Sequence, residues 1–62
     1  MEFHVPTLDS SEASKELEDT ILTSEPDAKI SIDLDNKKVK IESEASAETF
    51  KQLIVASGHT IE

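Results

Sequence analysis

Residues 29–42 read Lys-Ile-Ser-Ile-Asp-Leu-Asp-Asn-Lys-Lys-Val-Lys-Ile-Glu, and this stretch decides the fold. It contains two runs in which apolar and polar side chains alternate, separated by Asp35-Asn36-Lys37. Alternation with a period of two is typical of strands that bury one face. The polar tripeptide between the runs predicts a tight antiparallel hairpin, in which Asn36 tolerates a positive φ. The apolar positions of the hairpin, which are predicted to lie on its half-buried face, are Ile30, Ile32, Leu34, Val39 and Ile41.

A strand and a helix are predicted before the hairpin. Residues 2–5 alternate apolar and polar side chains, and Pro6 ends this strand because proline cannot donate to a ladder. Residues 9–12, Asp-Ser-Ser-Glu, have the capping-box pattern of a helix start, and the helix closes near Ser24, before Pro26. The buried stripe of this helix recurs every four residues, at Ala13, Leu17 and Ile21.

A second helix and a last strand are predicted after the hairpin. Ser46 is suited to the N-cap of the helix, and Gly58 suits the left-handed residue that follows its end. Residues 59–62, His-Thr-Ile-Glu, are left for a short final strand. The inner face of the helix is predicted to carry Phe50, Leu53, Ile54 and Ser57.

The predicted order of elements is therefore β-α-β-β-α-β, without a linker. Right-handed crossovers turn this order into an α+β fold, a ferredoxin-like βαββαβ sandwich. We expect a four-stranded antiparallel sheet with two helices on one face. The 62 residues make one domain, 1–62, close to the lower size limit for a self-supporting core.

Composition limits the partners of the chain. The net charge is −8, all six basic residues are lysines, and an acidic chain is repelled by the phosphate backbone, so no nucleic-acid partner is expected. No apolar run is long enough to span a bilayer, so no membrane partner is expected either. The N-terminus lacks a basic segment followed by an apolar one, which favours a cytoplasmic protein.

The same composition argues against catalysis. There is no cysteine nucleophile and no arginine that could hold a phosphate, as a phosphatase on this fold would need. The carboxylates fall on exposed phases of the predicted elements, where burial cannot shift their pKa toward acid–base work. We therefore expect that the protein is not an enzyme.

Four stretches resemble segments of one known family: Val5–Leu8, Ile30–Leu34, Lys37–Ile41 and Ala56–Glu62. Together with the order of elements, they resemble the heavy-metal-associated (HMA) domain of copper chaperones and of copper-transporting ATPases. The last stretch is similar to the family's Ala-Gly-Tyr/His-x-Val/Ile-Glu ending. The resemblance extends over 1–62 without a gap.

The resemblance implies a metal site that this chain has lost. In the family, the first loop reads Met-x-Cys-x-x-Cys, and its two thiolates hold Cu(I). Residue by residue, Leu8 takes the methionine position, and Ser10 and Ala13 take the cysteine positions. A register one residue later places Ser11 and Ser14 there instead. Cu(I) is soft and selects sulfur ligands, so the site is degenerate in both registers and no cofactor is expected.

An alternative set of metal ligands is centred on His59. The resemblance places this residue in the loop before the last strand, next to the first loop, where a histidine of some cyanobacterial copper chaperones approaches the metal. With Asp9 or Glu12, it would offer a nitrogen–oxygen site for weak binding of Zn(II), Ni(II) or Cu(II). The chain would then be a metal-binding or metal-transport protein. The opposing interpretation is a surface histidine, with Asp9 used as a helix cap.

The charges of the chain are polarised. The first helix and its flanks are acidic, whereas four of the six lysines lie on the hairpin. In related chaperones, the first loop and first helix form the face that docks onto a partner domain, guided by complementary charge. A copper-chaperone-like domain that acts by docking is thus predicted, with a basic protein partner such as a metal-transporting ATPase or a related HMA domain. An acidic face kept only for solvation is the alternative. The predicted docking residues are Glu12, Glu16, Asp19 and Leu22.

Overall fold

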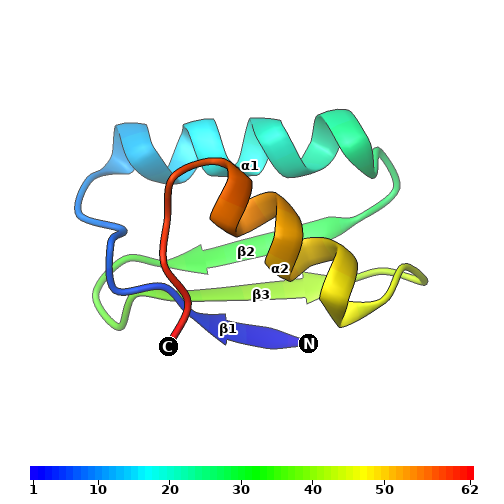
Figure 1. Ribbon diagram of the computed structural model, residues 1–62. Helices are drawn as coiled ribbons and strands as arrows, with labels where there is room; N and C mark the ends of the chain where they lie inside the picture. Colours follow the sequence, from blue (N-terminus) through cyan, green and yellow to red (C-terminus); the bar gives the residue numbers. More distant parts are fainter.

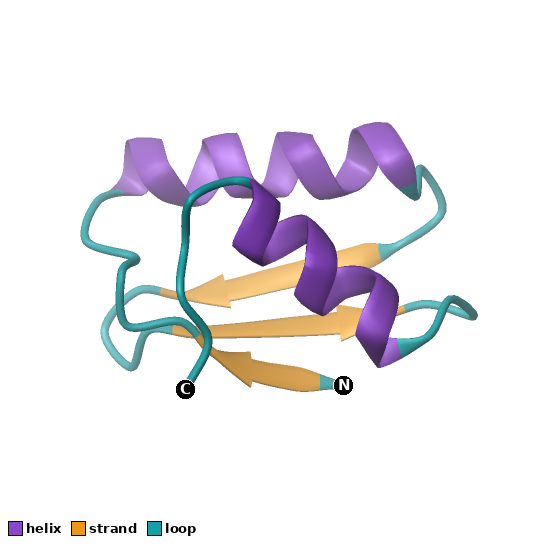
Figure 2. Ribbon diagram, in the orientation of Figure 1, coloured by secondary structure: helices purple, strands orange, loops and turns teal.

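The computed structural model describes residues 1–62 and contains three strands and two helices (Figure 1). Both helices cover the same face of the sheet, which leaves the other face open (Figure 2). Neither helix has the length and apolar composition needed to cross a membrane. The elements, in chain order, are β1 (Glu2–His4), α1 (Ser11–Ser24), β2 (Lys29–Asp33), β3 (Lys38–Glu42) and α2 (Ala47–Ala56).

The predicted hairpin is confirmed. β2 and β3 pair antiparallel, with Ile32 opposite Val39, and β1 pairs with the other side of β3 in the order β1-β3-β2. The positive φ, however, lies at Lys37 (56°) and not at Asn36. The Asp33 carboxylate accepts hydrogen bonds from the side-chain and backbone N–H groups of Asn36, at 2.8 and 3.3 Å, which hold Asn36 in place. These bonds, the side-chain bond foremost, lower the pKa of Asp33.

The sheet has three strands where the sequence predicted four. The segment after α2 runs back toward β1 (Figure 1), but only one backbone bond joins them, from the Glu62 N–H to the His4 carbonyl at 2.9 Å. Two donors of the expected strand are engaged elsewhere, because the His59 N–H bonds to the Ile54 carbonyl and the Thr60 N–H bonds to a side chain. The ferredoxin-like α+β fold itself is confirmed.

The core lies between the sheet and the two helices. The predicted stripes of both helices are confirmed, with Leu17 and Ile21 buried on α1 and Phe50 and Ile54 on α2. Ser57 is exposed instead of facing inward, because it caps α2 and donates its hydroxyl to the Ile54 carbonyl at 2.7 Å. The buried core consists of Phe3, Val5, Leu8, Leu17, Ile21, Ala28, Val39, Ile41, Phe50 and Ile54.

Local hydrogen bonds determine where the two helices begin and end. Ser46 is the N-cap of α2 and Gly58 has a φ of 95°, as predicted. The predicted N-cap of α1, Asp9, is wrong by one residue. The N-cap is Ser10, whose Oγ accepts the Ala13 N–H at 3.1 Å, and Asp9 is exposed. An uncharged hydroxyl therefore closes the first turn of α1.

Candidate functional site

The first loop, the start of α1 and the loop after α2 meet at one end of the molecule. Thr7 joins the two loops, because its Oγ1 lies 2.7 Å from His59 Nδ1 and also accepts the Thr60 N–H at 3.2 Å. The structure thus places the His59 loop beside the first loop. The sequence did not single out Thr7, and its only signal was its place after Pro6, within the stretch that resembles the family.

The Thr7 contact orients the half-buried His59 ring. Because Thr7 Oγ1 already accepts the Thr60 N–H, its own proton is free to be donated to Nδ1 of a neutral imidazole. In that tautomer Nε2 carries the hydrogen. A metal at Nε2 requires the other tautomer, in which Nδ1–H donates to Thr7, and such an outer-shell bond is what orients metal-binding histidines in proteins.

The predicted nitrogen–oxygen ligands do not converge. Asp9 and Glu12 are both exposed, and no group of three His, Cys, Asp or Glu side chains is arranged to hold a metal ion. The structure therefore brings together at most two of His59, Asp9 and Glu12. A tight site of three or four protein ligands cannot be built from this set.

The two positions that resemble the family's cysteines are adjacent in space. Ser10 ends the first loop and Ala13 lies in the first turn of α1, and the hydrogen bond between Ser10 Oγ and the Ala13 N–H links them. In the alternative register, Ser11 is exposed, whereas Ser14 Oγ is buried and has no hydrogen-bond partner. A hydrogen bond therefore joins Ser10 to Ala13, whereas none joins the side chains of Ser11 and Ser14.

The two serines should respond oppositely to truncation. Ser14→Ala removes a buried unpaired hydroxyl and should leave the melting temperature unchanged or raise it by a few degrees. Ser10→Ala removes the helix cap and should cost about 1 kcal/mol. Thermal unfolding followed by circular dichroism compares the two variants. A loss in Ser14→Ala as large as in Ser10→Ala would show that the Ser14 hydroxyl is hydrogen-bonded.

The acidic side of α1 is not neutralised within the molecule. The predicted docking residues Glu12, Glu16 and Asp19 are exposed, and Leu22 is half-buried beside them on α1. The ion pairs in the structure involve other residues: His4 with Glu62 at 3.3 Å, and Lys38 with Glu2 at 3.8 Å. None of the three α1 carboxylates therefore takes part in an ion pair.

Solved structures of copper chaperones share the fold of this chain. The copper chaperone Atx1 from Synechocystis is 26% identical to this chain with a TM-score of 0.93, and the match covers 100% of this chain and 98% of that one. A cyanobacterial copper metallochaperone is 28% identical with a TM-score of 0.80, covering 100% and 97%. This chain has the HMA fold of these copper chaperones. A gold binding protein, 23% identical with a TM-score of 0.92, covers 100% and 98% and shares the fold.

The HMA resemblance inferred from the sequence is thereby confirmed, together with the missing thiols, because the chain contains no cysteine. No protein-family model matches the sequence, and no curated protein is significantly similar to it. The likeness to copper chaperones therefore rests on solved structures that share the fold and are 26–28% identical to this chain. Ser10 and Ala13, which the resemblance places at the family's Cys-x-x-Cys positions, form the cap at the start of α1.

Proposed function

We propose that this chain is a copper-chaperone-like HMA domain that acts by docking onto a protein partner and not by passing Cu(I) between two cysteines. The observation that carries the proposal is the unpaired acidic stripe on α1, formed by Glu12, Glu16 and Asp19. The stripe begins two residues after Ser10, so it adjoins the loop that resembles the family's metal loop. Compared with the family, the chain would thus keep the end of the fold that docks onto partners, whereas it lacks the two thiolate ligands.

Like charges are neighbours along the stripe, and Lys15 between them forms no ion pair with them. Glu12, Glu16 and Asp19 stand four and three residues apart, so like charges are neighbours on one helix face and destabilise it by about 0.2–0.5 kcal/mol per pair. A basic partner surface would relieve this repulsion. The partner class is a metal-transporting ATPase or a related HMA domain, and Leu22 offers an apolar contact beside the charges.

Charge reversal tests this function. Glu16→Lys with Asp19→Lys should slow association with a basic, soluble domain of a copper-transporting ATPase on the order of tenfold at low salt, and should change dissociation little. The α1 helix should stay folded, because the lysine introduced at position 16 would face Glu12 four residues earlier. Raising salt to physiological ionic strength should weaken wild-type association, as screening shortens to about 8 Å.

The matched control has the same change in net charge elsewhere. Asp35 and Glu44 are exposed and lie outside α1, so Asp35→Lys with Glu44→Lys should slow association less than the α1 pair. Equal effects of both pairs would mean that only net charge matters. Association that ignores salt and both reversals would show that the acidic face serves solvation alone.

A second candidate function is weak binding of Zn(II), Ni(II) or Cu(II) at His59. It is favoured by the Thr7 contact, which orients the ring and leaves Nε2 without a hydrogen-bond partner. We expect a titration with each ion to give at most weak binding, lost in His59→Ala, retained in His4→Ala, and weakened by acid because a protonated imidazole cannot ligate. Binding that survives His59→Ala would exclude this site.

A further inference from the structure

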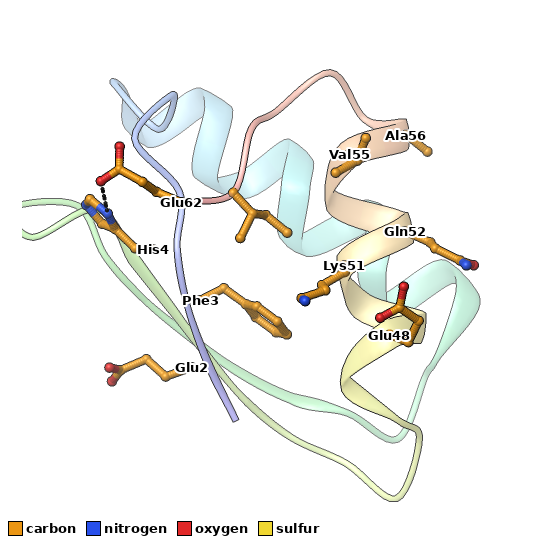
Figure 3. Close-up of a pocket in the computed structure, with 10 residues that line it drawn as sticks. Glu2, Phe3, His4, Glu48, Lys51, Gln52, Val55, Ala56 and Glu62 are labelled. Carbon is orange, nitrogen blue, oxygen red and sulfur yellow. Dashed lines mark ion pairs between the residues drawn. The ribbon is translucent and has the colours of Figure 1, made fainter.

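The two edges of the sheet differ in what covers them. Along β1, the Glu62 N–H bonds to the His4 carbonyl at 2.9 Å, and the Glu62 carboxylate lies 3.3 Å from His4 Nδ1 (Figure 3). β2 forms the other edge, in the order β1-β3-β2 (Figure 1). No backbone hydrogen bond outside the helices and strands involves Ile30 or Ile32 of β2. The edge of β2 is therefore the open one.

The register of the sheet shows which backbone groups of β2 are unpaired. β3 bonds to β1 through its odd-numbered residues, as in the bond from the Ile41 N–H to the Met1 carbonyl at 2.8 Å. Its even-numbered residues therefore bond to β2, and the residues opposite them are Lys29, Ser31 and Asp33. The N–H and C=O groups of Ile30 and Ile32 consequently point away from β3, outward from the edge.

The apolar side chains at this edge are incompletely covered. Ile30 and Ile32 are half-buried, whereas Ile41 and Val39, which lie opposite them on β3, are fully buried. Unpaired backbone groups beside partly exposed apolar side chains allow an edge strand to pair with a strand of another chain. The edge of β2 thus has the properties of a pairing surface.

The charges at the two ends of β2 are opposite. Lys29 begins the strand and Asp33 ends it, and both side chains are exposed. Lys29 forms no ion pair within the chain. The side chain of Asn36 donates to the Asp33 carboxylate at 2.8 Å and lowers the pKa of Asp33, so this group is ionised at neutral pH. A carboxylate has about four acceptor sites, which leaves room for a further donor.

We propose that β2 pairs antiparallel with β2 of a second copy of this chain, about a two-fold axis at Ser31. Ile30 of one copy then exchanges backbone hydrogen bonds with Ile32 of the partner copy, and the reverse, so that all their outward groups are paired. Lys29 of each copy lies opposite Asp33 of the partner copy, on the open face of the sheet. The strand is therefore complementary to itself in backbone, apolar and charged groups.

The net charge makes this dimer weak and sensitive to salt. Each copy carries −8, and a contact through one short strand is smaller than a standard interface, so we expect a Kd on the order of 100 µM. Salt screens the long-range repulsion between the copies, so raising it to physiological ionic strength should strengthen the dimer. This is the opposite of the salt dependence expected for docking through α1.

A cross-link tests the position of the axis. Ser31 is exposed and would lie opposite Ser31 of the partner copy with Cα atoms about 4.5 Å apart, within the range of a disulfide. Because the chain contains no cysteine, Ser31→Cys introduces a single thiol. With oxidised glutathione, it should form a covalent dimer at least about tenfold faster than Ser24→Cys, exposed at the end of α1. Equal rates would overturn the proposal.

A charge swap tests the pairing of the two ends. Lys29→Asp and Asp33→Lys should each weaken the dimer about tenfold, because each places like charges opposite one another. The double variant restores opposite charges at both ends and keeps the net charge at −8, so it should dimerise like the wild type. Analytical ultracentrifugation measures the dimer, and circular dichroism establishes that each variant is folded. A folded double variant that dimerises no better than the single variants would contradict this pairing.

Amide signals locate the contact in the wild type. Shifts that grow with protein concentration should appear at Ile30 and Ile32 and not along α1 or β1. Reversal at Glu16 and Asp19 changes no residue of this edge and should not abolish the dimer, so failure of α1 docking would not imply failure here. A chain that stays monomeric at about 1 mM would overturn the proposal. If a neutral threonine–valine hexapeptide shifted the same amides in that monomer, the edge would instead bind a strand of a different protein.

Discussion

Replacing Ser10 and Ala13 together by cysteine is expected to turn this chain into a protein that binds one Cu(I). The two positions already lie together, since Ser10 Oγ accepts the Ala13 N–H at 3.1 Å across the first turn of α1. Ser10 is exposed and Ala13 is only partly buried, so neither cysteine must be forced into the core. Two thiolates across this turn supply the soft ligands that Cu(I) selects.

The helix start should favour the thiolate form of the new cysteines. Position 10 is the N-cap and position 13 lies in the first turn of α1, where the unpaired N–H groups and the helix dipole lower the pKa of a thiol. Metal binding must displace any remaining thiol protons, so Cu(I) affinity should fall as the pH is lowered. The lost serine cap should cost about 1 kcal/mol, which binding of the metal to the folded state offsets.

The matched control is Ser11→Cys with Ser14→Cys, which has the same spacing one residue later. Ser11 is exposed and Ser14 Oγ is buried, so the two sulfurs would point into different environments and should bind Cu(I) far more weakly. Competition against a thiolate chelator ranks the two variants, and circular dichroism establishes that both are folded. Tighter binding by the second pair would show that the resemblance to the family's metal loop is shifted by one residue.

Periodic burial is the part of this fold that could be predicted from the sequence. A period of two placed β2 and β3, and a period near four placed Leu17 and Ile21 on α1 and Phe50 and Ile54 on α2. These patterns succeed because one buried face determines which side chains must point inward, whatever the loops do. The order of elements then leaves few topologies for so short a chain.

The predictions that failed depend on hydrogen bonds for which neighbouring residues compete. Asp9 and Ser10 both suit an N-cap, and Ser10 takes the position. Asn36 suits a left-handed conformation, but the Asp33 carboxylate binds it and Lys37 takes the positive φ. The fourth strand is missing because the donors of residues 59–60 bond elsewhere. The conformational propensity of a residue indicates which positions it can occupy. The hydrogen bonds of its neighbours decide which residue occupies a given position.

In the candidate site, too, some features could be predicted from the sequence and others could not. Its position at the two loops and its missing thiols could be read from the sequence by resemblance. The contact of Thr7 with His59 could not, since it joins residues 52 positions apart and depends on how both loops bend. Asp9 and Glu12 were chosen as ligands for their closeness in sequence to the loop, yet both face solvent. Metal sites require convergence, which residue type alone does not give.

The largest loss of stability is expected for Phe50→Ala. Phe50 is fully buried on α2, and truncating a buried phenylalanine costs about 3–5 kcal/mol because a cavity remains. A domain of this length has a total stability of roughly 3–9 kcal/mol, at about 0.05–0.15 kcal/mol per residue. The variant should therefore lose a large part or all of the stability of the domain. Urea denaturation followed by circular dichroism measures the free energy of unfolding.

Val55→Ala is the matched control on the same helix. Val55 is 58% exposed, so its truncation should change stability by less than about 0.5 kcal/mol. Phe50→Ala should also abolish partner association, because the fold that presents α1 is lost, whereas Val55→Ala should leave α1 docking intact. A Phe50→Ala protein with a wild-type urea midpoint would mean that α2 does not pack against the sheet as described.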